Sequence, residues 1–209
     1  MIAHSVYKCG GAVSFLQPTS TGFAYDTFSR TFVMKKIKPK TEHNRLEILR
    51  SCYRLMATGT WDAISVSELE KNISQTRGAI FYFNKNKEDL FINMIDELFF
   101  PVFKLSQSDK TNLKTCSTQT FFAMYKTPFE RVCNDLRINY KLDNPSQGLF
   151  NILIQAQNHY KGFRQIINDE IKCEMAEINR IIGLGKTISF DMDKIYAQSA
   201  GKIFLESLS

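Results

Sequence analysis

Apolar residues recur at helical spacing along most of the chain from about residue 42 onward. The first such run contains Leu46, Leu49, Tyr53 and Met56, at steps of three and four residues. We therefore expect a helix over residues 42–58, and Gly59 marks its end because glycine often follows the last turn of a helix.

Two shorter helices are predicted next. Ser65-Val66-Ser67-Glu68 has the pattern of a capping box, and the helix that it opens directs Val66, Leu69 and Ile73 inward. Thr76 is a suitable N-cap for a further helix, with Ile80 on its inner face. Two short helices joined by a tight turn, after one longer helix, are typical of a helix-turn-helix.

The remaining pattern is helical as well. Asn86 caps a fourth helix that runs to Pro101, and residues 106–120 are polar enough that we expect a loop there. Further helices are predicted over residues 129–140, from Asn144-Pro145 to Tyr160, over 170–182 and over about 192–208. Because no strand pattern competes with these runs, the predicted fold class is all-α.

Positive charge is concentrated in one segment. Residues 34–87 hold eleven Lys and Arg against five Asp and Glu, and they account for the net charge of +6 of the whole chain. Such a patch is typical of a module that neutralises phosphates. Met34 offers a sensible translation start, which makes residues 1–33 a candidate extension, and we assign no structure to residues 1–40 beyond a basic arm.

Composition favours a soluble cytoplasmic protein. The five cysteines and three histidines show no metal-ligand spacing, so we expect no metal site, no cofactor and reduced thiols. No run is long and apolar enough to cross a bilayer, so no membrane partner is expected. Because no catalytic motif occurs at meaningful spacing, we do not expect an enzyme.

The segment from Asn44 to Phe91 resembles the DNA-binding domain of the tetracycline-repressor-like (TetR/AcrR) transcriptional regulators. Ser65-Val66 matches the Thr-Val of the family, and Thr76-Arg77-Gly78 matches its Ser-x-Gly. Asn86-Lys87-Glu88-Asp89-Leu90 matches the closing Asn-Lys-Glu-x-Leu, and no gap interrupts the spacing from Ser65. Some positions depart from the family pattern: Glu70, Phe81, Phe83 and Asn84 replace its alanine, tyrosine, histidine and phenylalanine.

A recognition helix that enters the major groove N-terminus first presents its opening residues to the bases. The expected base-reading residues are Gln75, Thr76, Arg77, Gly78 and Ala79. The expected phosphate contacts are Lys36, Lys38, Lys40, Tyr82, Lys85 and Lys87. We expect Tyr82 at the surface, whereas Phe81 is either a core ring or part of the interface.

The resemblance divides the chain into a helix-turn-helix domain over residues 41–91 and a regulatory domain over residues 92–209. In this family the second domain holds a small-molecule pocket and forms a homodimer through its last two helices. Candidate pocket residues are Phe121, Phe122, Met124, Tyr125, His159, Tyr160 and Phe163. Each of these is either a pocket residue or an ordinary core side chain.

The sequence therefore predicts one of two functions. The first is a ligand-responsive regulator, a repressor, that binds an inverted-repeat DNA operator as a homodimer and responds to a small-molecule effector. The second is a helical small-molecule or partner-binding protein of the same fold that has lost operator binding, which the departures at Glu70, Phe81 and Asn84 suggest.

Overall fold

The computed structural model describes residues 39–73, 75–115, 117–183 and 192–207, and every regular element in these ranges is helical. The first half of the chain contains α1 (Pro39–Thr58), η1 (Trp61–Ala63), α2 (Val66–Ile73), α3 (Arg77–Tyr82), α4 (Lys87–Met94), η2 (Ile95–Phe99) and α5 (Phe100–Phe103). The second half contains α6 (Gln107–Thr115), α7 (Thr118–Met124), α8 (Pro128–Ile138), α9 (Pro145–His159), α10 (Phe163–Gly183) and α11 (Met192–Ser207). The prediction of an all-α fold is thus confirmed for the described residues.

Local sequence signals explain where several helices begin. The Thr76 hydroxyl accepts a hydrogen bond from the Ala79 amide at 3.3 Å, as expected of an N-cap. At Ser65 the capping box is complete, because the Glu68 carboxylate also accepts from the Ser65 amide at 2.6 Å. Comparable caps precede α4, α8 and α9, at Asn86, Thr127 and Asn144.

Three sequence predictions need correction. The segment expected to be a loop, residues 106–120, contains all of α6 and the start of α7. Ser106 and Ser117 accept hydrogen bonds from amides three residues later and act as N-caps. The helix expected from residue 170 begins at Phe163, whose side chain is buried in the core. Finally, α1 begins at Pro39 rather than Glu42, since proline fits the first turn of a helix.

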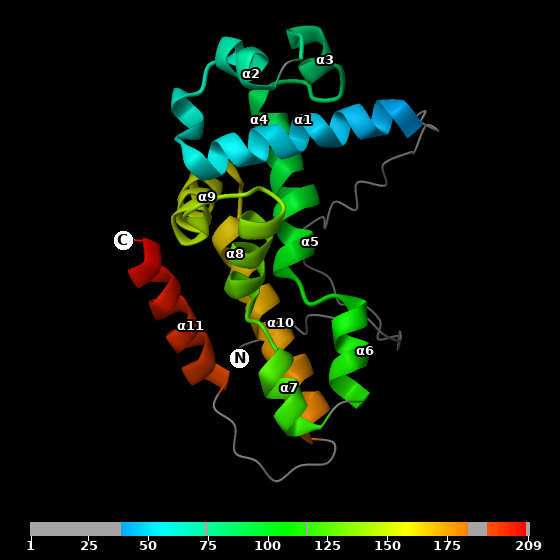
Figure 1. Cartoon of the computed structure of the whole chain (residues 1–209), viewed down its shortest axis with the longest axis vertical. Coiled ribbons are helices and arrows are strands. Elements are labelled where there is room, and N and C mark those ends of the chain that lie inside the picture. Colours follow the sequence, from blue (N-terminus) through cyan, green and yellow to red (C-terminus); the bar gives the residue numbers. More distant parts are fainter. Residues whose placement is uncertain (1–38, 74, 116, 184–191, 208–209) are drawn as a thin grey trace, which may run out of the picture. The chain divides into compact units, whose positions relative to one another are not determined.

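One wide turn interrupts a longer helix. The elements α4, η2 and α5 follow one another without a break, and Figure 1 shows them as one continuous run. The middle element, Ile95–Phe99, is a π-helical turn. A π-helical turn contains one more residue than an ordinary α-helical turn, so it alters which side chains face the core beyond it. Phe99 at its end and Phe100 and Phe103 after it are all buried.

The helix α9 lies at the centre of the packing, against α1, α8 and α11. A Cβ at its Gly148 would lie 2.6 Å from the Leu142 Cδ2 atom, so the glycine leaves room for the Leu142 side chain of the preceding loop. One hydrophobic core therefore extends from α1 to α11. The boundary predicted at residue 91 stays a prediction, and it does not coincide with a gap in packing because α1 contacts α9 directly.

Candidate nucleic-acid interface

The short helix α3 is anchored on one side and open on the other. Its Ile80 side chain is fully buried, and α3 packs against α2. Arg77 and Gly78 in the first turn are exposed, and Gln75 and Ala79 are half-buried beside them. The nearest atom to a Cβ built on Gly78 is the Thr76 hydroxyl at 3.9 Å, so the space in front of this backbone is open.

The three aromatic residues after Ile80 differ in how far they are exposed. Tyr82 is 75% exposed, which confirms its predicted surface position. Phe81 is half-buried and packs against the hydrophobic core. The Phe83 ring meets the exposed Tyr82 ring edge-on at the end of α3, with centroids 4.8 Å apart.

Asn84 has a structural role that sequence reasoning missed. Its side chain is 2% exposed, and its amide nitrogen donates to the Ile80 carbonyl at 3.0 Å. The Asn93 amide in turn donates to the Asn84 Oδ1 atom at 2.8 Å. Asn84 therefore ties the end of α3 to α4. The signal available in the sequence was a polar residue between two helices, where such a residue can accept or donate bonds at a helix end.

The two lysines that follow differ in their surroundings. Lys85 is exposed, and its backbone amide donates to the Asp89 carboxylate at 3.1 Å. The Lys87 ammonium instead donates to the Trp61 carbonyl at 2.6 Å and lies 5.0 Å from the centre of the Trp61 ring. Lys87 thus faces the protein in this structure, and its predicted phosphate contact stays a prediction. Lys40 belongs to the first turn of α1, whereas Lys36 and Lys38 lie outside the described residues.

The loop around Trp61 is held by amide side chains of α9. The Gln155 Oε1 atom accepts a hydrogen bond from the Trp61 backbone amide. The Gln155 Nε2 atom donates to the carbonyls of Met56 and Gly59 at 3.0 and 3.1 Å, and Asn151 donates to the Ala57 carbonyl at 2.9 Å. These bonds satisfy carbonyls at the end of α1 that have no partner within the helix.

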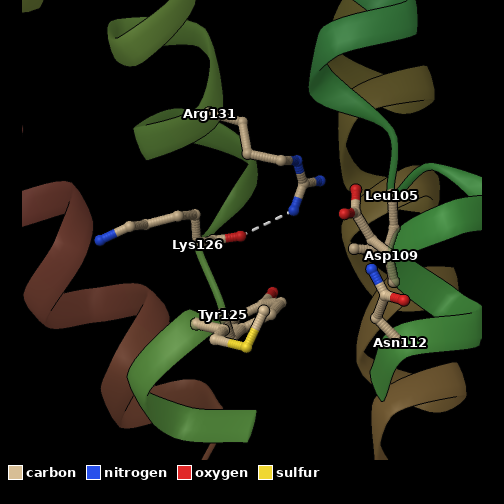
Figure 2. Close-up of a pocket in the computed structure, with 7 residues that line it drawn as sticks. Leu105, Asp109, Asn112, Tyr125, Lys126 and Arg131 are labelled. Atoms are coloured by element: carbon tan, nitrogen blue, oxygen red, sulfur yellow. Dashed lines mark hydrogen bonds between the residues drawn. The ribbon is translucent and has the colours of Figure 1, made fainter. Parts of the chain in front are cut away.

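A separate cavity of about 230 Å³ lies between α6, α7 and α8. Its lining residues are Leu105, Asp109, Asn112, Met124, Tyr125, Lys126 and Arg131. Figure 2 shows Arg131 reaching from one side toward Leu105, Asp109 and Asn112 on the other, while the Lys126 side chain points away from them. The cavity therefore combines apolar walls with amide, carboxylate and guanidinium groups.

Arg131 and Glu174 form a buried ion pair at this cavity. Their side chains are 14% and 5% exposed, and the closest N–O distance is 2.6 Å. Arg131 also donates to the carbonyls of Val102, Phe103 and Lys126. The Tyr125 hydroxyl donates to Glu174 at 2.5 Å. The pair thus connects α8 with α10 and with the end of α5.

The structure does not gather the seven predicted pocket residues in one place. Met124 and Tyr125 line the cavity, and the buried Phe121 ring stacks on Tyr125 at 5.6 Å. The Phe122 side chain lies outside the described residues. The last three predicted residues, His159, Tyr160 and Phe163, are not among the residues that line it.

Those three residues have other partners. The His159 Nε2 atom lies 3.1 Å from an Asp62 carboxylate oxygen, and the His159 ring packs on Phe91. Burial and the hydrogen bond that Tyr160 donates to Asp96 at 2.6 Å raise the pKa of the Tyr160 hydroxyl. Phe163 belongs to the aromatic cluster with Phe99. These contacts are those of side chains that pack between helices, and not of residues that line a pocket.

Comparison with protein-family models, with curated proteins and with solved structures found no match for this chain. Within the described residues, no three or more His, Cys, Asp and Glu side chains gather as a metal site requires. The described helices also include none with the length and apolar character needed to cross a membrane.

Proposed function

We propose that this chain is a sequence-specific DNA-binding transcriptional regulator of the tetracycline-repressor-like class. It acts as a ligand-responsive repressor and binds an inverted-repeat operator as a homodimer. The observation that carries the proposal is α3, which has a capped start and a buried anchor in Ile80 but exposed residues at Arg77, Gly78 and Tyr82. In this proposal α2 and α3 are the helix-turn-helix, with α1 packed against α2.

The residues at the start of α3 have the chemistry that DNA recognition needs. Arg77 can bond a guanine through two nitrogens, and Gln75 can do the same with an adenine. The open backbone at Gly78 allows close approach to the duplex, and the methyl group of Ala79 suits a thymine methyl. Tyr82 and Lys85 then contact phosphates on the flanking backbone, together with the basic arm that contains Lys36, Lys38 and Lys40.

An apolar surface on α9 and α11 supports the proposed homodimer, and it differs from the last two helices, α10 and α11, that the resemblance implied for the interface. Phe204 and Leu205 of α11 are 46% and 69% exposed, and Ile154 of α9 is 54% exposed. The Phe150 ring lies 5.7 Å from the Phe204 ring, so the two helices contribute to one surface, the α9–α11 patch (Phe150, Ile154, Phe204 and Leu205). Apolar patches of this kind mark protein–protein contacts.

The effector is proposed to act by binding one conformation of the dimer more tightly than another. The cavity lined by Met124, Tyr125 and Arg131 is a candidate for its site. A ligand shifts the equilibrium only by its differential affinity for the two states. The states that matter here differ in the separation of the two α3 helices, which must match half-sites about 34–36 Å apart.

The test is fluorescence anisotropy with duplex DNA from both sides of the gene for this protein. We expect sub-micromolar affinity that falls steeply as salt is raised. Arg77→Ala should weaken binding by about 1–3 kcal/mol at the specific site and relax base preference. Lys85→Ala should weaken binding to all sequences and lower the salt slope by about 1.

Lys172→Ala is the matched control, because Lys172 is an exposed lysine on α10, remote in sequence from α3. It should leave both affinity and salt slope unchanged. Indifference of the wild-type protein to these duplexes at every salt concentration would contradict the proposal and favour a binding protein that has lost its operator. An Arg77→Ala effect that resembles the Lys85→Ala effect would instead show that Arg77 contacts phosphate.

A further inference from the structure

A second hollow, separate from the cavity at Arg131, lies between α1, the η2–α5 segment and the end of α8. It has a volume of about 660 Å³. The residues that line this groove are Glu47, Arg50, Ser51, Arg54, Glu97, Leu98, Pro101, Val102, Asp135, Asn139, Tyr140 and Lys141. We call it the α1–α8 groove. Its volume lies within the range of small-molecule sites.

The carboxylates of the groove are already paired. Glu47 bonds Arg50 at 3.3 Å, and Glu97 bonds Arg45, which lies outside the lining, at 2.5 Å. Asp135 accepts a hydrogen bond from the Asn139 amide at 2.6 Å. Each carboxylate of the groove therefore already has a polar partner among the described residues.

Two cations of the groove have no charged partner among the described residues, Arg54 on α1 and Lys141 after α8. Lys141 has a φ of 55°, the left-handed conformation that favours glycine. The turn is closed by the Leu142 amide, which donates to the Leu136 carbonyl at 3.2 Å. Lys141 is the left-handed residue that commonly follows the C-terminus of a helix, and glycine would suit the position better than lysine does.

One wall of the groove is aromatic, and another is apolar. Tyr140 lines the groove, and its ring lies 5.0 Å from the ring of the fully buried Tyr53. Leu98, Pro101 and Val102 supply apolar surface from the η2–α5 segment.

We propose that the α1–α8 groove binds a small amphipathic carboxylic acid, with its carboxylate at Arg54 and Lys141 and its apolar body against Leu98 and Val102. A guanidinium matches a planar carboxylate through two parallel hydrogen bonds, and a lysine adds a point charge. This site is distinct from the effector cavity at Arg131, and its existence does not depend on DNA binding.

Isothermal titration calorimetry of the full chain with sodium octanoate tests the proposal, with octan-1-ol and octylammonium as probes that lack the negative charge. We expect saturable binding of one octanoate, and binding of the other two probes at least tenfold weaker. Arg54→Gln should weaken octanoate binding by about tenfold, because a charge-assisted hydrogen bond is lost.

Lys141→Gly separates binding from folding. Glycine suits the backbone at this position, so the thermal midpoint of Lys141→Gly should equal or exceed that of the wild type, while octanoate affinity falls about tenfold. Lys172→Gln on α10 is the control and should bind octanoate as the wild type does. The proposal is overturned if octanoate shows no saturable binding, if octan-1-ol binds equally well, or if Arg54→Gln and Lys141→Gly leave octanoate affinity unchanged.

Discussion

At the scale of single residues, Arg131 joins several segments of the described chain. Its guanidinium bonds a buried carboxylate and three backbone carbonyls from two other segments. An arginine can serve so many acceptors because its five N–H groups point outward in one plane. Arg131 therefore determines how the ends of α5 and α7 meet α8.

Arg131→Met should lower the free energy of unfolding by about 3–5 kcal/mol, because it leaves Glu174 buried without its cationic partner. Urea unfolding followed by circular dichroism measures the change. Arg137→Met, an exposed arginine on the same helix, should shift the free energy by no more than about 0.5 kcal/mol. If the pair is the cause, Arg131→Met combined with Glu174→Leu should recover part of the loss, and a fully additive double variant would contradict this account.

At the scale of elements, α9 supplies hydrogen-bond donors to the C-terminal end of α1. The side chains of Asn151 and Gln155 are four residues apart on α9, so they lie on one face of the helix and meet the last carbonyls of α1 together. The C-terminus of a helix is usually satisfied by water or by a following glycine turn. Here two side-chain amides from a remote helix perform that task. Directional hydrogen bonds therefore join α9 to α1 in addition to apolar contacts.

Gln155→Leu should lower the free energy of unfolding by about 3 kcal/mol, because the Trp61 amide and two carbonyls lose their partner within the core. Chemical denaturation measures the loss. Gln157→Leu on the exposed side of α9 is the matched control and should have little effect. Equal stability of the two variants would show that water replaces the Gln155 amide without penalty.

Elements defined by local signals could be predicted from the sequence, and those defined by remote contacts could not. The caps at Ser65, Thr76 and Asn86 lie three residues from the amides that they bond, so the pattern contains the whole interaction. The partner of Lys87, in contrast, is Trp61, twenty-six residues away. Nothing in the basic run itself distinguishes this lysine from the exposed Lys85.

The difference between local signals and remote contacts also explains two wrong predictions, the loop in place of α6 and the grouping of the pocket residues. Apolar periodicity is weak across residues 107–115, so the helix there could be recognised only from its serine cap. The aromatic residues assigned to one pocket are separated in space because Tyr160 and Phe163 pack toward the η2–α5 segment, while Met124 and Tyr125 face α6. Aromatic content indicates burial but not which residues share a cavity.

At the scale of the whole molecule, the continuous core and the α9–α11 patch bear on the proposed assembly. The core runs from α1, which packs against α2, to α11, whose Phe204 and Leu205 are exposed. A dimer formed on this patch would connect to the proposed DNA-binding elements through α9, the helix that holds the end of α1.

Phe204→Glu should convert the proposed homodimer to a monomer, because it places a charge in an apolar interface. Sedimentation velocity measures the mass. Anisotropy should show at least a tenfold loss of operator affinity, because the two α3 helices are no longer held in one dimer. Ala123→Glu, an exposed site on α7, is the control and should stay dimeric. A wild-type protein that sediments as a monomer at micromolar concentration would contradict the proposed dimer.

The π-helical turn at Ile95–Phe99 has a consequence for chain length. One additional residue turns everything after it by about 100° around the helix axis, since an α-helix advances by 3.6 residues per turn. Deletion of a single residue here would preserve a helix but rotate Phe100 and Phe103 out of step with α4. The rings that now meet Tyr160 and Phe129 would then point elsewhere. The number of residues in this segment is therefore constrained as tightly as their identity.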